Sequence, residues 1–222
     1  MLNQHKLLAS GRSSDVFDLG DGFVLRKFKS GGDAEFEAAV MEHVRAAGYP
    51  VPRVHESRPG ELVLDRIDGR TMLEDIYRCP WRAQRHARTL ARLHERLHRI
   101  PAPEWLPACV ETTQARAGDP AAVLHLDLHP GNVLLSARGP SVIDWTNARS
   151  GPAKLDVVLS WVIAATSGRL ARAWGRLFVR AAGASSLCLD AGSATLAEAV
   201  ELRLRDPNLD AAERARVRRL LD

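Results

Sequence analysis

A polar cluster between two aliphatic runs constrains the fold of this chain more than any other stretch. In Val123–Leu135, "VLHLDLHPGNVLL", two histidines, an aspartate and an asparagine interrupt an otherwise apolar sequence. Aliphatic runs of this kind are typical of strands that enter a core. Burying polar side chains there is costly unless they are satisfied, so they need a structural or chemical reason.

The residues after this cluster predict a β-hairpin. "VLLSARGPSVI" divides into a strand at Val133–Leu135, a turn at Arg138–Pro140 and a strand at Val142–Ile143. Because a hairpin brings its two ends together, we expect Asn132 at its entrance and Asp144 at its exit to be neighbours.

This pair of side chains suits a magnesium ion. Mg²⁺ binds oxygen ligands, often only one or two carboxylates, and completes its shell with water and phosphate oxygens. Asp127 lies on the loop that leads to Asn132, where its carboxylate can accept a proton from an incoming hydroxyl. The pattern therefore predicts a phosphoryl-transfer site.

The rest of the chain predicts an α+β protein of two lobes. Residues 1–68 combine strands, a tight "GDG" hairpin turn and one helix at 34–47 with Asp33 as its N-cap. Residues 69–222 are mostly helical in pattern. A cleft between two such lobes is a favoured place for a ligand.

Composition places the chain among soluble proteins. It has 222 residues, 45% hydrophobic and 26% charged, with a formal net charge of +4. This mildly basic balance suits a phosphate-bearing ligand. Cys79, Cys109 and Cys188 show no metal-binding spacing, which indicates a reduced, cytoplasmic protein.

No membrane or secretion signal is expected. The stretch "MLNQHKLLAS" is too polar for a signal peptide, and "LDVVLSWVIAATSG" is too short to span a bilayer and reads as a buried helix. Nothing in the sequence indicates an obligate protein partner.

The two polar motifs resemble those of the aminoglycoside phosphotransferase and choline kinase family, relatives of the protein kinases. "HLDLHPGNVLL" resembles the family's catalytic loop, and "VIDW" resembles its metal-binding motif. The resemblance implies a bilobal protein-kinase-like fold with a small antiparallel-sheet lobe and a larger helical lobe. It implies transfer of the γ-phosphate of ATP, with GTP not excluded, to a hydroxyl of a small molecule such as an antibiotic, choline or another metabolite, with Mg²⁺.

The resemblance also implies roles for individual residues. Asp127 is the expected catalytic base, Asn132 a Mg²⁺ ligand and Asp144 the main Mg²⁺ ligand. His125 braces the loop by hydrogen bonding. His129 stands where protein kinases place a lysine near the γ-phosphate.

One position departs from the family pattern. Leu126 stands where the family usually has glycine. Since leucine disfavours positive φ, we expect an ordinary backbone conformation at this residue.

The N-terminal lobe carries the expected nucleotide-binding residues. "ASGRSSDVF" resembles the family's phosphate-positioning loop, with the Ser13 and Ser14 hydroxyls over the phosphates. In "FVLRKF", side chains alternate, so only one of Arg26 and Lys27 can face the phosphates. The match to "VLR" favours Arg26, whereas lysine is the commoner cation in protein kinases, so both stay open.

An anion and a linker complete the expected nucleotide site. Glu37 falls at the family's ion-pair position and is expected to orient the cation. In "LVLDRIDG", backbone groups of Asp65 and Ile67 are expected to bind the purine edge. Asp156 matches a family aspartate that is structural rather than catalytic.

Several other residues receive a structural interpretation. His94 and His98 lie four apart with no obvious third ligand, so they are expected on a helix surface. Trp161 and Trp174 are expected in the core. The short, proline-rich span 99–124 predicts an open acceptor site.

The sequence leaves three alternatives to a small-molecule kinase. A protein-kinase-like regulator lacks support because the chain has no Asp-Phe-Gly motif and no Ala-Pro-Glu after the "HLDLHPGN" stretch. A nucleotide-binding pseudo-kinase would bind ATP without turnover. Nucleic-acid binding by the basic C-terminal helix with Arg214, Arg216, Arg218 and Arg219 is the third interpretation, and it requires a salt-dependent affinity for DNA or RNA.

Overall fold

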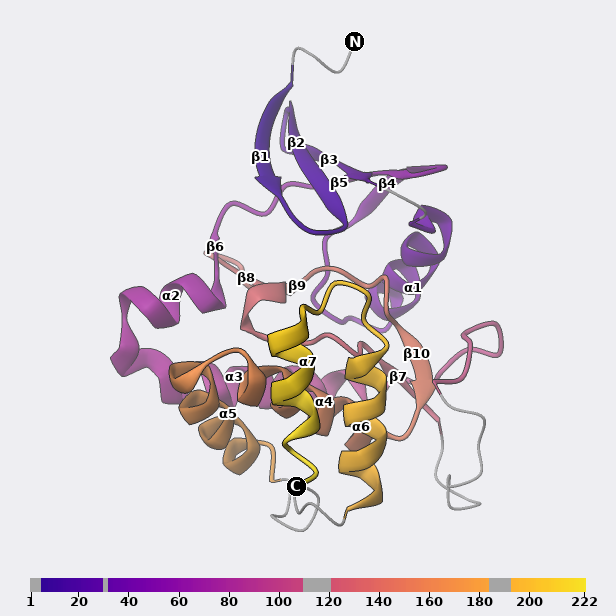
Figure 1. The fold of residues 1–222 in the computed structure, drawn as a ribbon. Helices are drawn as coiled ribbons and strands as arrows, with labels where there is room; N and C mark the ends of the chain where they lie inside the picture. Colours follow the sequence, from indigo (N-terminus) through magenta and orange to yellow (C-terminus); the bar gives the residue numbers. More distant parts are fainter. Residues whose placement is uncertain (1–4, 30–31, 110–120, 184–192) are drawn as a thin grey trace. The chain divides into compact units, whose positions relative to one another are not determined.

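The computed structural model of the chain describes residues 5–29, 32–109, 121–183 and 193–222. These residues form two compact units, which are described separately (Figure 1). Unit 1 comprises Met1–Arg70 and Val133–Thr146, and unit 2 comprises Thr71–Asn132 and Asn147–Asp222. The predicted hairpin thus belongs to unit 1, although it follows a long segment of unit 2. The boundary between the two predicted lobes, after residue 68, stays a prediction.

Unit 1 contains a five-stranded antiparallel sheet of order β1-β2-β3-β5-β4. Its strands are β1 (Lys6–Ser10), β2 (Ser14–Gly20), β3 (Phe23–Phe28), β4 (Val54–Arg58) and β5 (Glu61–Asp65). The predicted "GDG" turn joins β2 to β3, and its three residues have φ values of 78°, 50° and 84°. Two glycines make this left-handed turn accessible.

The helix α1 (Ala34–Ala46) lies beside the sheet of unit 1 (Figure 1). The Asp33 side chain accepts the Phe36 N–H at 2.9 Å, as the sequence predicts for an N-cap. Gly48, with φ 79°, follows the end of the helix. Val40, Met41 and Val44 are buried and hold the helix to the core.

The predicted hairpin is formed by β8 (Val133–Ser136) and β9 (Gly139–Val142). Ser136 pairs with Gly139, so the turn is Ala137–Arg138, and the predicted turn at Arg138–Pro140 was one residue late. Gly139 adopts φ 109°, a conformation that is accessible to glycine. The pairing of β8 with β9 therefore begins at Gly139, and Pro140 lies in β9 rather than in the turn. Within unit 1, the Val142 N–H donates to the Pro50 carbonyl at 2.8 Å.

Unit 2 is mainly helical. Its helices are α2 (Met72–Arg78), α3 (Ala83–Leu97), α4 (Ala153–Thr166), α5 (Arg169–Ala181), α6 (Ala194–Leu204) and α7 (Ala211–Arg218), with 3-10 turns η2 (Pro80–Arg82) and η3 (Pro130–Asn132). The short strands β7 (Ala122–Leu124) and β10 (Arg149–Gly151) pair with each other, and β6 (Arg70–Thr71) carries the chain from unit 1 into unit 2.

Helix α4 is the centre of the unit 2 core. Leu155, Val158 and Val162 are almost fully buried and pack with residues of α6 and α7. The prediction of a buried helix here is confirmed. In the described ranges, no helix combines the length and the apolar character needed to cross a membrane.

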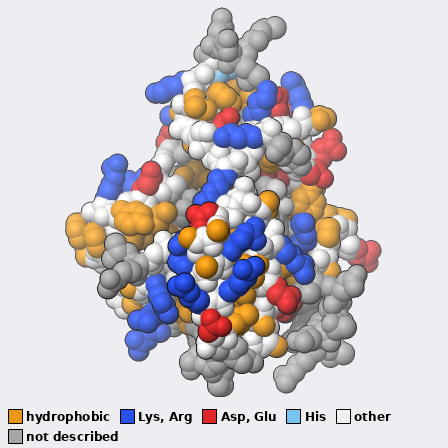
Figure 2. Space-filling view, viewed as in Figure 1, with side chains coloured by type: hydrophobic (Ala, Val, Ile, Leu, Met, Phe, Trp, Pro, Cys, Tyr) orange, Lys and Arg blue, Asp and Glu red, His pale blue; other side chains and the backbone are white. Residues whose placement is uncertain are grey.

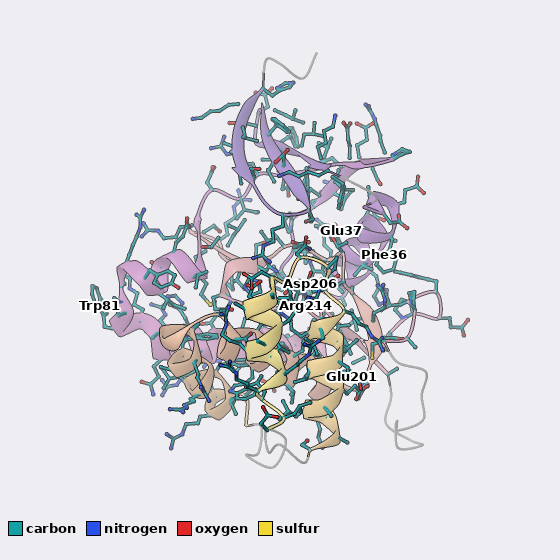
Figure 3. All side chains as sticks on the ribbon, in the orientation of Figure 1. Phe36, Glu37, Trp81, Glu201, Asp206 and Arg214 are labelled. Carbon is teal, nitrogen blue, oxygen red and sulfur yellow. The ribbon has the colours of Figure 1, made fainter. Side chains whose placement is uncertain are left out.

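The aromatic residues of unit 2 divide into core and surface. Trp174 is buried and stacks on Phe178 at a centroid distance of 5.8 Å, as expected for a core residue. Trp81, in contrast, is 77% exposed and projects outward (Figure 3).

Basic side chains gather over the C-terminal helices (Figure 2). Asp210 caps α7 in a reciprocal pair with Glu213. Arg214 donates to the backbone carbonyls of Leu204, Asp206 and Leu209, and closes the loop between α6 and α7 (Figure 3). At least one cation of this basic segment therefore has a structural partner in the chain itself.

Candidate active site

Arg26 is the centre of a polar cluster inside unit 1. Its side chain forms an ion pair with Glu37 and donates to Asp144 Oδ1 at 2.7 Å. Its Nε donates to Ser14 Oγ at 3.0 Å. Only 6% of Arg26 is exposed, so the sheet holds this guanidinium in one orientation.

The neighbouring Lys27 has different partners. Side chains alternate along β3, and Lys27 pairs with Glu61 on β5 at 3.2 Å with 43% of its side chain exposed. Arg26 is thus the residue of this pair that contacts Glu37 and Asp144.

Glu37 is fully buried and satisfied by several donors. Besides Arg26, its carboxylate accepts the Trp145 N–H at 3.0 Å and the Thr146 hydroxyl at 3.0 Å. Burial raises the pKa of Glu37, and the Arg26 charge offsets part of that rise. Burial alone would lower the pKa of Arg26, but the Glu37 and Asp144 carboxylates outweigh it and raise that pKa.

Asp144 follows β9 with an unusual backbone. Its φ is 68°, a left-handed conformation that residues other than Gly, Asn and Asp seldom adopt. The next residue, Trp145, is buried and bonded through its N–H to Glu37, which fixes the turn. The Asp144 carboxylate stays 33% exposed, and its Oδ1 lies 3.1 Å from the Thr146 hydroxyl oxygen.

The other residues expected to bind the nucleotide lie in or next to the sheet of unit 1, and their roles stay predictions. Ser14 is 8% exposed and its hydroxyl is engaged by Arg26, so it orients the cation. The Ser13 carbonyl accepts the Lys29 N–H at 2.9 Å.

The residues expected at the purine edge lie at or just after the end of β5. The Asp65 N–H donates to the Arg53 carbonyl at 2.9 Å, so the Asp65 carbonyl is the backbone group of this residue that could bind a purine edge. Ile67 follows β5 and is half-buried.

In unit 2, Asp127 and Asn132 are fixed to each other. The Asn132 Nδ2 donates to the Asp127 main-chain oxygen at 2.9 Å and to its Oδ2 at 3.1 Å. The amide nitrogen thus faces Asp127, and the carboxamide oxygen is the atom oriented for another ligand. Both side chains are half-buried.

Two histidines brace this loop. His125 is fully buried, and its Nδ1 accepts the Asp127 N–H at 3.3 Å. His129 Nδ1 accepts the Gly131 N–H at 3.0 Å, so its Nε2 carries the proton and lies 3.8 Å from Asp127 Oδ1. A Cβ at Gly131 would lie 2.6 Å from the His129 ring, so a larger residue there would force the ring to move.

The expectation for Leu126 was wrong. Its φ is 59°, in the left-handed region that leucine disfavours. The reason lies in Asp156 on α4, which is fully buried and accepts the Leu126 N–H at 2.8 Å and the His125 N–H at 3.1 Å. These two hydrogen bonds hold the strained conformation.

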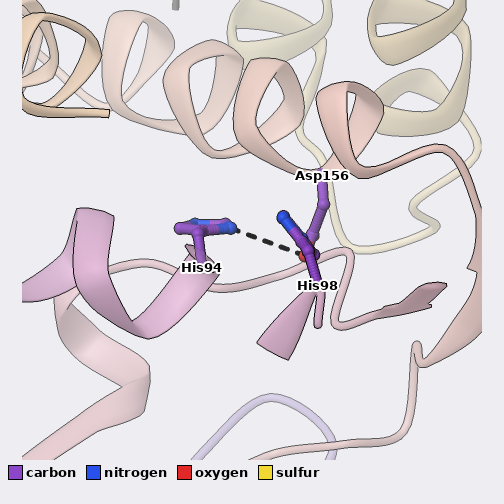
Figure 4. Close-up of side chains that lie close together, drawn as sticks. All are labelled: His94, His98 and Asp156. Atoms are coloured by element: carbon purple, nitrogen blue, oxygen red, sulfur yellow. Dashed lines mark hydrogen bonds and ion pairs between the residues drawn. The ribbon is translucent and has the colours of Figure 1, made fainter. Parts of the chain in front are cut away.

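The expectation that His94 and His98 lie on a helix surface was also wrong. His94 is 1% exposed, and His98 lies 3.0 Å from Asp156 Oδ2 through its Nε2 (Figure 4). Asp156 is the third polar group that the sequence spacing did not reveal, because α3 and α4 are far apart in the chain.

The comparisons with known proteins bear on this arrangement. A family model described as "Phosphotransferase enzyme family" matches residues 4–115 and 102–191, which together span most of the chain. The chain belongs to this phosphotransferase family. A search of proteins with curated descriptions finds no match.

Solved structures similar to this phosphotransferase show the same fold. Aminoglycoside phosphotransferase APH(4)-Ia, as a thermostable mutant with AMP-PNP and hygromycin B, has a TM-score of 0.70 at 16% identity over 98% of this chain and 92% of that chain. A choline/ethanolamine kinase family protein from Mesorhizobium loti has a TM-score of 0.63 at 17% identity over 98% and 88%. The streptomycin-ATP complex of APH(2″)-IIa has a TM-score of 0.60 at 15% identity over 91% and 82%.

These findings confirm the resemblance and the α+β, protein-kinase-like fold. The phosphotransferase is a small-molecule kinase by family. Sequence reasoning missed Thr146, whose hydroxyl bonds both Glu37 and Asp144. The sequence could have indicated this residue, because Thr146 directly follows the "IDW" motif and carries a hydroxyl group two residues after Asp144.

Proposed function

We propose that this phosphotransferase moves the γ-phosphate of ATP to a hydroxyl group of a small-molecule acceptor, with Mg²⁺. The observation that carries the proposal is the Asp127 carboxylate, which Asn132 and the histidine-braced loop hold in one orientation. A carboxylate fixed in this way suits the positioning of an acceptor hydroxyl.

We assign the phosphate-binding cation to Arg26. It is the buried cation of β3 and is oriented by Glu37 and Ser14. A planar guanidinium held on two sides binds phosphate oxygens with less loss of side-chain entropy than a mobile lysine does. The Ser13 region and the backbone of Asp65 and Ile67 are assigned to the nucleotide as the family pattern implies.

The donor set fits a magnesium ion. Asp144 offers a partly exposed carboxylate, and Asn132 offers the carboxamide oxygen that does not face Asp127. Both are hard oxygen ligands of the kind that Mg²⁺ prefers. When bound, the ion supplies positive charge to the phosphate oxygens.

The protein's own residues then define the proton path. Asn132 holds Asp127 Oδ2, so we assign Oδ1 as the atom that accepts the hydroxyl proton as the acceptor oxygen attacks phosphorus. The His129 Nε2–H, 3.8 Å from Oδ1, stabilises the ionised carboxylate before transfer. Arg26 stabilises charge on the phosphates that leave as ADP.

The acceptor class is drawn from the similar structures. Those proteins include complexes with streptomycin, gentamicin and hygromycin B, and a choline/ethanolamine kinase family member. We propose an acceptor of this kind, a hydroxyl-bearing and often cationic small molecule in the cytoplasm. An antibiotic acceptor would give the protein a role in resistance.

An ADP-release screen tests the proposal. The purified protein is incubated with Mg·ATP and panels of aminoglycosides, choline-like amines, sugars and nucleoside antibiotics. We expect acceptor-dependent ADP release from at least one panel and a rate loss of roughly 10²–10⁴ in Asp127→Asn. Glu104→Gln, which removes an exposed carboxylate of unit 2, is the matched control and should keep full activity.

Two outcomes contradict the proposal. A Mg²⁺-dependent rise in Tm with ATP but no turnover on any panel would identify a nucleotide-binding pseudo-kinase. Phosphate transfer to peptides but not to small molecules would identify a protein-kinase-like regulator.

A further inference from the structure

Three potential metal ligands converge inside unit 2. His94 and His98 come from α3 and its C-terminal end, and Asp156 comes from the first turn of α4 (Figure 4). Asp156 Oδ2 lies 3.5 Å from His94 Nδ1 and 3.0 Å from His98 Nε2. One ligand atom from each residue lies within 4.8 Å of the other two.

The hydrogen bonds determine which atom of His94 carries a proton. The Ser160 hydroxyl donates to the Leu128 carbonyl at 2.6 Å, so its single proton is used. His94 Nε2, 3.1 Å from the same hydroxyl oxygen, must therefore be the donor. In the neutral ring, Nδ1 then carries a lone pair.

That lone pair has no hydrogen-bond partner among the described residues. It is fully buried and faces the Asp156 carboxylate, which offers no proton when ionised. A buried nitrogen lone pair next to a carboxylate oxygen is unfavourable unless a cation lies between them.

A pocket gives access to this cluster. It has a volume of about 280 Å³. Its lining residues are Ala91, His94, Glu95, His98, Arg99, Val157 of α4 and Ala182, which follows α5. Glu95 and Arg99 have side chains that are 61% and 72% exposed, so they stand at the solvent side of the pocket. A cation and a water molecule can enter by this route.

We propose that His94 Nδ1, His98 Nε2 and Asp156 Oδ2 form a binding site for a zinc-class divalent metal ion. Tetrahedral Zn²⁺ with ligand bonds of about 2.0–2.2 Å places ligand atoms roughly 3.3–3.6 Å apart. The two distances to Asp156 Oδ2 are close to this range. Water from the pocket takes the fourth position.

The ligand chemistry separates this site from the reaction's magnesium ion. Two imidazoles and one carboxylate suit Zn²⁺, Co²⁺ or Ni²⁺, whereas Mg²⁺ prefers oxygen ligands alone. Asp156 Oδ1 keeps the Leu126 N–H while Oδ2 binds the metal. The metal would therefore reinforce the carboxylate that holds the strained backbone next to Asp127.

Metal titration of the tag-free protein tests the proposal directly. We expect Zn²⁺ to be taken from a chromogenic chelator at one equivalent, and Co²⁺ to give the intense visible bands of a tetrahedral site. Excess Mg²⁺ should displace neither. His98→Ala should lose more affinity than the roughly 10–100-fold that loss of an outer-shell partner costs.

The control is His55→Ala, which removes a histidine that also pairs with an aspartate, Asp65, at 2.7 Å. It should bind Zn²⁺ as the wild type does. Absence of stoichiometric uptake, or equal affinity in His98→Ala and wild type, would overturn the proposal.

If His98→Ala does not fold, zinc-edge X-ray absorption of the wild type is the second test. Two nitrogen donors from imidazole would support the site, and a shell of oxygen donors alone would refute it. Because the readout is metal binding, the result does not depend on the proposed kinase activity.

Discussion

Each unit contains one fully buried carboxylate that holds a left-handed residue near a candidate catalytic group. In unit 1, Glu37 accepts the N–H of Trp145, next to Asp144 with φ 68°. In unit 2, Asp156 accepts the N–H of Leu126, next to Asp127, with φ 59° at Leu126. The two units thus use the same device to present an aspartate.

The two carboxylates differ in the charge that faces them. Glu37 pairs with Arg26, whose charge is permanent at any pH that the protein tolerates. Asp156 faces the imidazoles of His94 and His98, and burial lowers the pKa of His94. The charge that faces Glu37 is therefore fixed, whereas the charge that faces Asp156 depends on the protonation of His94.

The largest effect is expected from Arg26→Met. Removing one partner of a buried ion pair typically costs about 3–5 kcal/mol, because the other charge is left uncompensated. Urea unfolding at pH 7–8 should show this loss in the free energy of unfolding. Lys27→Met, the adjacent exposed cation, should cost at most about 1 kcal/mol.

The pH dependence of Arg26→Met gives a further check. Without Arg26, burial raises the pKa of Glu37 with less opposition, because only the hydrogen bonds from Trp145 and Thr146 still lower it. The folded state then binds a proton more tightly than the unfolded chain does. The destabilisation should therefore shrink as pH falls towards 5. Equal losses in Arg26→Met and Lys27→Met would contradict the assigned difference between the two cations.

A smaller effect is expected at Leu126. At an ordinary position, glycine is less stable than alanine by roughly 0.5–1 kcal/mol. At φ 59° the order should reverse, because a left-handed conformation costs a residue with a Cβ about 1–2 kcal/mol. Leu126→Gly should therefore be more stable than Leu126→Ala by about 1 kcal/mol in urea unfolding. The usual order of the two variants would show that this backbone is not strained.

The smallest effect is a pH slope that belongs to unit 2. Burial lowers the pKa of His94 below its usual 6.5, so below that pH the unfolded chain binds more protons than the folded one. Stability should be complete above about pH 6.5 and fall as the pH drops towards 5. Asp156, whose pKa is lowered by its histidine partners against the effect of burial, adds a loss only below its usual 3.8.

His94→Gln tests the origin of this slope. Its amide can still donate to Ser160, and it does not titrate, so the slope of stability between about pH 7 and pH 5 should flatten. The measurements are made with EDTA present so that bound metal does not contribute. An unchanged slope would assign the pH dependence to other histidines.

Much of the fold was predictable from the sequence because local signals were strong. The Asp33 cap, the "GDG" turn and the buried helix at α4 each depend on residues that are close in sequence. The turn between β8 and β9 was misplaced because Pro140 reads as a turn residue, although it pairs with Leu135.

The candidate site was predictable only where a motif carried it. Asp127, Asn132 and Asp144 stand in recognisable motifs, but the left-handed backbone at Leu126 depends on Asp156, thirty residues further along the chain. The burial of His94 depends on the same long-range contact between α3 and α4. Spacing within one helix cannot reveal a ligand that another helix supplies.

The most direct measurement is the rate of phosphate transfer by Asp127→Asn at saturating Mg·ATP. The ATP affinity of the variant is measured in parallel to show that the nucleotide is still bound. We predict a turnover reduced by roughly 10²–10⁴ with ATP affinity little changed, since the role proposed for Asp127 is on the acceptor hydroxyl and not on the nucleotide. A variant that turns over at the wild-type rate would contradict the account.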